Sequence, residues 1–319
     1  MHYLVGTDEA GYGPNLGPLV ISATVWEVPD EVQSNSLYDR LADAVAAAPG
    51  RGDPRVAIGD SKDLYKPGKG LRLLERGLWA AWRLLGRQPG TCAEAWDLLA
   101  ERTAGPRHEA LCDGFDAEPA PRHADRAELE RFAPRLIASF ASAGVRLAAM
   151  HSRVVFPAEF NDTVAQCESK GQALSRWTLD LVGRSIAPID RGRISILCDK
   201  HGGRDRYLPL LVESFPDVLF QICEEGRQRS VYRGGSPDRR IEIAFQAKAE
   251  SHLPNALASM ASKYLRELAM EAFNAFWSAR VPGLAPTAGY PQDAPRFKQQ
   301  IADAQNRLDI ADRILWRVK

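Results

Sequence analysis

The chain has 319 residues, enough for one large domain or two modest ones. Charged residues make up 26% and hydrophobic residues 45% of the chain, a globular balance that excludes an intrinsically disordered protein. The formal net charge is zero, so any nucleic-acid binding must come from a local basic face.

The cysteines and the N-terminus indicate the compartment. Five cysteines are an odd number, and without a CxxC pair they argue against a disulfide framework and against a structural zinc site. The N-terminus lacks a charged region followed by an apolar run, and no apolar stretch reaches membrane-spanning length. We therefore expect a cytoplasmic protein that does not associate with membranes.

The first predicted elements form a hairpin. Tyr3 to Val5 begin a short strand, and Leu19 to Val28 are rich in Val, Ile and Thr, as strands are. A glycine-rich turn separates the two runs, which predicts an antiparallel pair. Asp8 and Glu9 then lie near the end of the first strand.

Helices and strands alternate in the rest of the chain, which predicts a mixed-sheet α/β fold. Expected helices cover 69–85, 93–102, 125–142, 162–186 and 254–278 and open the tail 295–319, and expected strands cover 145–156, 194–198, 217–223 and 241–247. Residues 86–143 are rich in Ala, Arg and Pro, and we interpret them as a helical insertion. The expected domains are a core of 1–85 and 144–265, this insertion, and a helical C-terminal extension of 266–319.

Carboxylates at strand ends are typical of a magnesium site. Mg²⁺ takes oxygen ligands and is commonly held by one or two carboxylates together with substrate phosphate. Asp8 closes the first predicted strand and Asp199 follows the strand 194–198. They converge if those two strands are neighbours, which spacing alone does not show.

Several short motifs in one order carry a family resemblance. The segment GTDEAGYGPNLGPLVISA, residues 6–23, resembles the opening signature of type 2 ribonucleases H, the HII enzymes and their HIII relatives. Further similar elements follow in the family's order: Gly59–Leu64, Phe160-Asn161, Leu197–Asp199, Lys248–Glu250, Ala258–Lys263 with Arg266-Glu267, and Gly289–Pro291. The resemblance misses residues 86–143.

The resemblance implies a five-stranded mixed sheet flanked by helices. It implies catalysis and metal binding by Asp8, Glu9, Asp199 and Glu250, with two Mg²⁺ or Mn²⁺ ions. Position and resemblance together give these candidates for substrate binding: Gly11, Tyr12, Gly13, Ser61, Lys62, Asn161, Arg204, Ser259 and Lys263. Ser259 and Lys263 are four residues apart and therefore share one helix face.

The sequence departs from the family at three positions. Tyr12 replaces an Arg or Lys, in a loop that helps the family recognise the ribose 2′-hydroxyl. Glu250 replaces an Asp, which lengthens the arm by one methylene. Leu265 stands where the family has a junction-reading tyrosine, with Tyr264 beside it.

The stretch from Arg227 to Arg240 contains five arginines, one aspartate and Tyr232. It is interpreted either as a phosphate-tracking hairpin or as an exposed loop with solvated charges.

The function predicted from these observations is a metal-dependent endonuclease. It would hydrolyse the RNA strand of an RNA/DNA hybrid, or a ribonucleotide-containing duplex, by two-metal attack of water. Three alternatives remain: a structure-specific DNA nuclease on the same fold, a nucleic-acid-binding relative without turnover, and a phosphotransferase acting on a small substrate. The sequence does not specify the oligomeric state.

Overall fold

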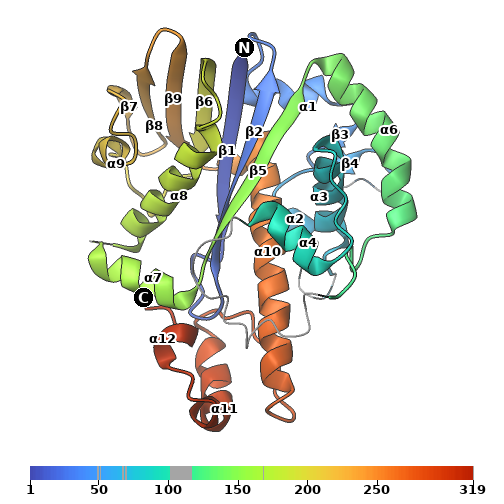
Figure 1. Ribbon diagram of the computed structural model, residues 1–319, viewed down its shortest axis with the longest axis vertical. Coiled ribbons are helices and arrows are strands. Elements are labelled where there is room, and N and C mark those ends of the chain that lie inside the picture. The colour runs from blue at the N-terminus through green and yellow to red at the C-terminus, as the bar shows by residue number, and fades with distance from the viewer. Residues whose placement is uncertain are drawn as a thin grey trace.

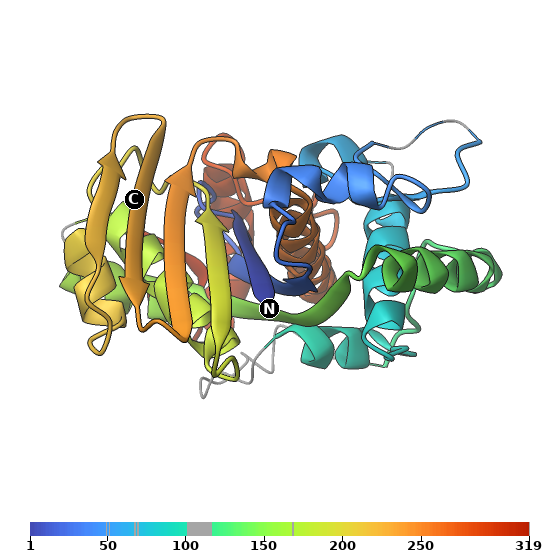
Figure 2. The same cartoon turned by 90° about the horizontal axis from the view of Figure 1, so that it is seen from above.

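The computed structural model describes residues 1–48, 50, 52–66, 68, 70–100, 117–167 and 169–318. A seven-stranded mixed sheet in the order β5-β2-β1-β6-β9-β8-β7 runs through the molecule (Figures 1 and 2). Its strands are β1 (His2–Ala10), β2 (Leu19–Val28), β5 (Arg146–Val155), β6 (Gly192–Cys198), β7 (Gln221–Glu225), β8 (Arg229–Gly235) and β9 (Arg239–Gln246). A two-stranded parallel pair, β3 (Val45–Ala46) and β4 (Val56–Ala57), lies outside it.

Helices cover both faces of the sheet. The longer ones are α3 (Arg72–Leu84), α4 (Cys92–Leu99), α6 (Arg126–Ala143), α7 (Pro157–Gln166), α8 (Lys170–Ile186), α10 (Leu253–Ser278) and α11 (Ala294–Arg307). The short ones are η1 (Ser34–Ser36), α1 (Leu37–Arg40), α2 (Ser61–Leu64), α9 (Leu208–Ser214), η2 (Ala249–Ser251) and α12 (Asp312–Leu315). None of the helices in the described residues has the length and apolarity needed to cross a membrane.

The centre of the sheet mixes parallel and antiparallel pairs. β1 pairs antiparallel with β2 on one side and parallel with β6 on the other. β6 in turn pairs parallel with β9. The carboxyl ends of β1, β6 and β9 therefore meet at one edge of the sheet, where loops and side chains can converge on a ligand.

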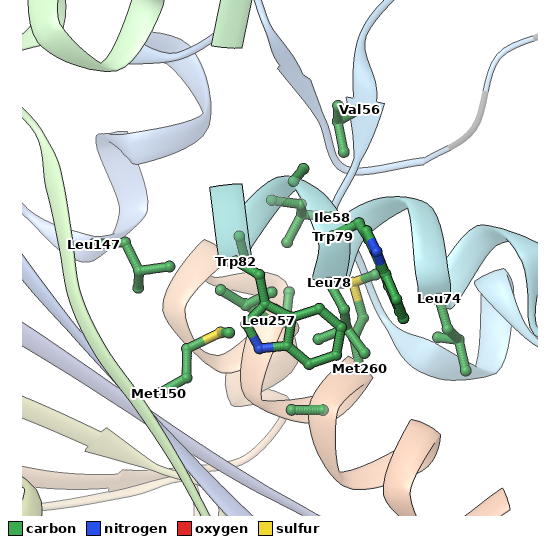
Figure 3. Close-up of a cluster of buried hydrophobic side chains, with 14 of the residues drawn as sticks. Val56, Ile58, Leu74, Leu78, Trp79, Trp82, Leu147, Met150, Leu257 and Met260 are labelled. Atoms are coloured by element: carbon green, nitrogen blue, oxygen red, sulfur yellow. The ribbon is translucent and has the colours of Figure 1, made fainter. Parts of the chain in front are cut away.

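Alternation along the strands separates the two cores. Leu4 points to an apolar cluster shared with α3, α6 and α10, whereas its neighbour Val5 points to a cluster shared with α8 and α9. Figure 3 shows the first cluster, in which Trp82 lies among side chains of α3, α10 and β5. A third cluster joins the C-terminal half of α10 to α11 and α12.

The mixed α/β fold class predicted from sequence is confirmed, and the sheet has two strands more than expected. The extra pairing comes from the arginine-rich stretch, where β8 forms a hairpin with β9 and buries Tyr232. The single helix expected over 162–186 is wrong, because the chain forms α7 and α8 with a break between them. Ser169 caps α8 by accepting a hydrogen bond from the Gln172 amide, which favours a new helix start over continuation.

The predicted domain limits remain a prediction. Helices α4 and α6 lie in the proposed insertion 86–143, and residues 101–116 lie outside the described part of the chain. Leu136 and Phe140 of α6 belong to the same apolar cluster as α3 and α10. The expected boundary between 265 and 266 falls inside α10, which continues unbroken to Ser278.

A buried carboxylate fixes the segment that leads into α6. Glu75 of α3 is fully buried and accepts hydrogen bonds from the backbone amides of Arg122, His123 and Ala124, each at 2.7–2.8 Å. These three donors meet the hydrogen-bonding needs of the buried Glu75 side chain. In return, Glu75 provides an acceptor for three backbone amides that have no helical partner.

We predict that Glu75→Ala lowers the free energy of unfolding by roughly 3 kcal/mol or more, because three amides lose their acceptor. Urea titration followed by circular dichroism measures the change. Asp43→Ala, at an exposed position, is the control and should alter stability by less than about 0.5 kcal/mol. Equal stability of the two variants would contradict the assigned role of Glu75.

Candidate carboxylate site

Three parallel strands bring carboxylates to the same edge of the sheet. Gly6 of β1 pairs with Leu197 of β6, so Asp8 and Asp199, each two residues further along, extend from neighbouring strand ends. Cys198 pairs with Phe245 of β9, and the chain after β9 turns into η2, which carries Glu250. We refer to Asp8, Glu9, Asp199 and Glu250 as the carboxylate cluster.

Burial and neighbouring charges raise the pKa values of Asp8 and Glu9. Burial raises the pKa of Asp8 to about 7, and the charges of Asp199 and Glu250 add to the rise. Burial, followed by the charges of Asp8, Asp199 and Glu250, raises the pKa of Glu9 to about 8. Asp8 and Glu9 keep part of their surface accessible to solvent, as groups that meet a ligand must.

Asp199 and Glu250 complete the cluster. Burial raises the pKa of Asp199, and so does the charge of Glu250, while the backbone amides of Lys200 and Ala249 oppose the rise. One nearby cation offsets part of the repulsion: Nζ of Lys62 lies 3.9 Å from Oε1 of Glu250. Because Lys62 is 80% exposed, this contact stabilises the cluster only weakly.

The chemistry of the cluster fits a divalent cation. Every donor is a carboxylate oxygen, the ligand type that Mg²⁺ and Mn²⁺ prefer, and a bound cation would stabilise the ionised forms that burial, and after it the neighbouring charges, disfavour. Within the described residues, no three His, Cys, Asp or Glu side chains already enclose a metal position. The cluster therefore supplies the donor set, and binding would require its side chains to close around the ion.

A buried asparagine that sequence reasoning missed holds the two central strands at the site. Nδ2 of Asn255, in the first turn of α10, donates to the carbonyl oxygen of Thr7 at 2.9 Å and to that of Leu197 at 2.8 Å. These carbonyls lie just before Asp8 and Asp199. Gly6 permits the contact, because a Cβ there would collide with the backbone of Pro254 and Asn255.

Two buried polar residues of α10, Asn255 and Ser262, contact the backbone at the site, and only part of this role has a signal in the sequence. Asn255 is a polar residue among apolar neighbours near the start of an expected helix, and a fully buried amide requires hydrogen-bond partners. Ser262, one turn further on from Ser259, donates to the carbonyl of Asp8 at 3.0 Å. The partners that hold β1, Thr7 for Asn255 and Asp8 for Ser262, lie 248 and 254 residues away, which no local pattern indicates.

Several predicted substrate-binding residues border the cluster. Ser259 Oγ donates to Ser61 Oγ at 2.9 Å, and a hydrogen bond from Ser259 favours the ionised form of Asp8. Asp60 caps α2 by accepting from the Lys62 amide, so the motif both starts a helix and places Lys62 beside Glu250. Lys263 lies one helical turn beyond Ser259 on α10.

Lys263 is occupied by protein contacts. Its Nζ pairs with Glu267 Oε1 at 2.6 Å and lies 4.4 Å from the ring centre of Tyr65. The Tyr65 hydroxyl donates to the other Glu267 oxygen at 2.7 Å.

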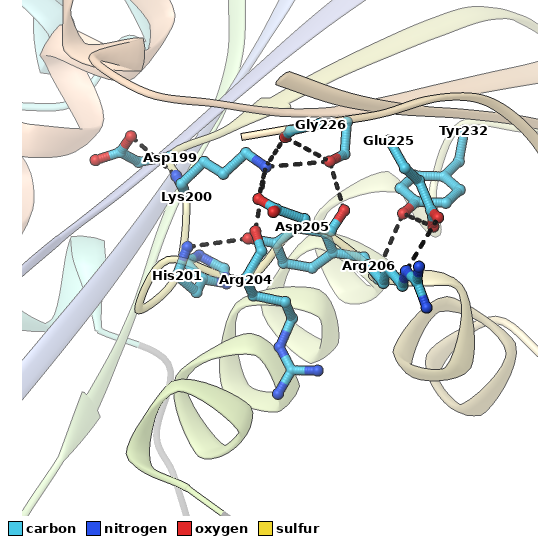
Figure 4. Close-up of polar contacts among 11 residues, drawn as sticks. Asp199, Lys200, His201, Arg204, Asp205, Arg206, Glu225, Gly226 and Tyr232 are labelled. Atoms are coloured by element: carbon cyan, nitrogen blue, oxygen red, sulfur yellow. Dashed lines mark hydrogen bonds and ion pairs between the residues drawn. The ribbon is translucent and has the colours of Figure 1, made fainter. Parts of the chain in front are cut away.

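Two other predicted residues are placed away from the cluster. The side chain of Asn161, on α7, binds the C-terminal segment: Nδ2 donates to the carbonyls of Arg313 and Trp316, and Oδ1 accepts from the Val318 amide. Arg204 points away from Asp199 in Figure 4. The loop motif at 201–206 therefore does not bring Arg204 to the carboxylates.

The same loop is organised by Lys200, which sequence reasoning also missed (Figure 4). Its Nζ donates to Gly226 O at 2.6 Å, to Arg204 O at 3.1 Å and to Ser230 Oγ at 3.1 Å, and it pairs with Asp205. Lys200 thus connects the segment after Asp199 to β8, while its backbone amide donates to Asp199 Oδ1 at 2.9 Å.

The glycine-rich loop after β1 lies over a buried cation. Gly11 has φ +88°, and a Cβ there would meet Nε of Arg266 at 2.5 Å. Glycine is therefore required both by the backbone conformation and by the close approach. Burial raises the pKa of Tyr12, and the charge of Glu9 contributes to that rise, which places the Tyr12 hydroxyl within the field of the carboxylate cluster.

Comparison with known proteins gives similarity in structure alone. No protein-family model matches the chain, and no curated protein matches it in sequence. The ribonuclease H2 from Pyrococcus horikoshii OT3 is similar with a TM-score of 0.46 and 15% identity, over 98% of this chain and 92% of that one. Bst-RNase HIII in complex with Mn²⁺ gives a TM-score of 0.43 at 14% identity, over 99% of this chain and 66% of that one.

The RNase HII of a PCNA:RNase HII complex from Archaeoglobus fulgidus has a TM-score of 0.42 and 14% identity, over 99% of this chain and 94% of that one. These proteins bear the names of the family that the sequence motifs resemble.

We predict that Asn255→Ala lowers the free energy of unfolding by roughly 2 kcal/mol or more, because two buried carbonyls lose their donor. Chemical denaturation measures the effect. Asn274→Ala is a matched control on the same helix: its side chain also makes two hydrogen bonds, to the backbone of Thr287, but Asn274 is only partly buried, so its loss should be smaller. A larger loss in the control would contradict the role assigned to Asn255.

We predict that Asp8→Asn stabilises the metal-free protein, by on the order of 1 kcal/mol at pH 8. The pKa of Asp8 is raised to about 7, so the wild-type protein loses the stability of the protonated form as pH rises through that value. The asparagine variant lacks this titration. Thermal melts in EDTA at pH 5.5 and 8 should show the difference in Tm growing with pH, and a difference that shrinks would refute the assignment.

Proposed function

We propose that this protein is a divalent-metal-dependent phosphodiester hydrolase that cleaves the RNA strand of RNA/DNA hybrids or ribonucleotide-containing duplexes. The observation that supports this most is the convergence of Asp8, Asp199 and Glu250 at the ends of three parallel strands. Burial, together with the charges of Asp199 and Glu250, disfavours an ionised Asp8 without a cation, which supports a cation-binding role for this place. The motif order of the sequence favours this substrate class.

In this proposal the carboxylate cluster holds two Mg²⁺ or Mn²⁺ ions, which supply activation of water and stabilisation of the leaving oxygen. Asn255 and Ser262 fix the backbone that carries Asp8. Ser259 and Ser61 present hydroxyls beside Asp8, where a sugar–phosphate strand would pass. Lys62 is exposed and therefore free to move from Glu250 to a phosphate oxygen.

Tyr12 is the reason to retain a second candidate function. The loop carries an aromatic ring where the resembling family has a cation, and a ring can stack on a base of any nucleic acid. A structure-specific DNA nuclease is therefore the alternative, acting through the same carboxylates.

A cytoplasmic location remains an expectation.

The test compares labelled duplexes in Mg²⁺ or Mn²⁺: all-DNA, RNA/DNA hybrid, DNA with one ribonucleotide, and branched DNA. We expect cutting of the ribose-containing strands. Asp8→Asn should lower the rate by roughly 10³-fold, because one charge that stabilises the transition state is lost. Asp303→Asn, an exposed carboxylate on α11, is the matched control and should cleave like the wild type.

Cutting of branched DNA alone would favour the alternative function. Full activity of Asp8→Asn would refute the assignment of the site. Binding without cleavage, unrescued by Mn²⁺ or by Glu250→Asp, would indicate a relative that has lost turnover.

A further inference from the structure

We propose that Lys170, supported by the buried guanidinium groups of Arg317 and Arg266, forms a phosphate-binding subsite against the loop Gly11–Gly13. The inference deepens the proposed function, because the phosphate would belong to the bound nucleic-acid strand. The subsite is built from α8, α10 and the C-terminal segment, none of which is adjacent to the loop in sequence.

Lys170 lies beside the aromatic ring of the loop, Tyr12. It is half-buried in the first turn of α8, with Nζ 5.2 Å from the ring centre of Tyr12 and 5.5 Å from that of Phe160. Burial lowers its pKa, and the charged group that lowers it further is another cation, Arg317. The Lys170 ammonium therefore lies near two aromatic rings and within the field of a second cation.

Arg317 contacts the chain directly after the loop, at Pro14, and is 1% exposed. Its Nη2 donates to the carbonyl of Pro14, and its backbone amide donates to the carbonyl of Asn15 at 2.8 Å. Nε and Nη1 are buried without a hydrogen-bond partner among the described residues. Its Cζ lies 4.9 Å from the ring centre of Phe160, the ring that Lys170 also approaches.

Arg266 lies beneath the other end of the loop, under Gly11. It is also 1% exposed, and its Nε is likewise buried without a partner among the described residues. Its nearest carboxylate oxygen belongs to Glu267, 3.5 Å from Nη1, and the same oxygen is 2.6 Å from Lys263. One carboxylate is thus shared between two cations.

Two of the three cations at this loop act on each other. Burial and the charge of Arg266 lower the pKa of Arg317 to about 9, which shows that the two guanidinium groups act on each other. Burying an unpaired charge is costly unless a counter-ion offsets it. An anion at the loop would interact favourably with all three cations.

The open side of the loop offers the place for that anion. Gly13 is exposed, and a Cβ built on it would meet no atom within 4 Å, so a ligand can approach its backbone. A phosphate oxygen there would interact directly with Lys170, while the arginines below strengthen the field. Lys170 of α8 would thereby supply the positive charge that the resembling family carries at position 12, where this chain has a tyrosine.

The experiment uses binding rather than cleavage, so that it is independent of catalysis. In the Asp8→Asn background and in EDTA, the affinity for an RNA/DNA hybrid is measured at several NaCl concentrations for Lys170→Gln, Lys170→Arg and the control Arg131→Gln. Arg131 is exposed on α6, far from α8 in Figure 1, and its substitution removes the same charge. Protection of each variant by inorganic phosphate is measured by thermal melting.

Loss of one phosphate contact should reduce the slope of log K against log salt by about 0.9 in Lys170→Gln. The slope should be unchanged in Lys170→Arg and in Arg131→Gln, and the rise in Tm with phosphate should disappear only in Lys170→Gln. Equal slopes and equal phosphate protection in Lys170→Gln and Arg131→Gln would overturn the proposal.

Failure of the subsite and failure of the proposed function give different results. Phosphate protection that depends on Lys170, without hybrid binding, would support the subsite and refute the nucleic-acid substrate. Hybrid cleavage with an unchanged salt slope in Lys170→Gln would support the function and refute the subsite.

Discussion

The contact between α10 and the ends of β1 and β6 is the constraint on which the site depends. Gly6 lets the first turn of α10 touch the sheet, and Asn255 then bridges the carbonyls of Thr7 and Leu197. A neutral amide thereby donates to two backbone acceptors on neighbouring strands. Asp8, directly after Thr7, and Asp199, two residues after Leu197, are thereby held on neighbouring strand ends.

This arrangement concentrates negative charge where water is partly excluded. The raised pKa values of Asp8 and Glu9 express the free-energy cost of burying these carboxylates, to which the neighbouring charges add. Lys62 offsets little of it, because its side chain is largely in solvent. Such a cost is tolerated where function requires it, since the rest of the fold provides large apolar cores.

The C-terminal segment fixes the loop that borders the carboxylates. Leu16 pairs with Trp316, Asn15 and Arg317 bond each other's backbone, and Asn161 accepts from Val318. Asn161 belongs to a motif that resembles an element of type 2 ribonucleases H, and here it binds the C-terminal segment of its own chain. The loop geometry therefore depends on residues about 300 positions away in sequence.

The sequence by itself determined the elements and their chemistry. Leu19–Val28 was predicted as a strand with the limits that β2 has, and Asp8, Glu9 and Asp199 were predicted at strand ends, because strand alternation and carboxylate chemistry are local properties. Only the tertiary structure decided which strands are neighbours, and with them the placement of Glu250. It also decided the bridging of Asn255, the diversion of Asn161 to the tail and the gathering of Lys170, Arg266 and Arg317, because these contacts join distant segments whose approach is set by packing and register.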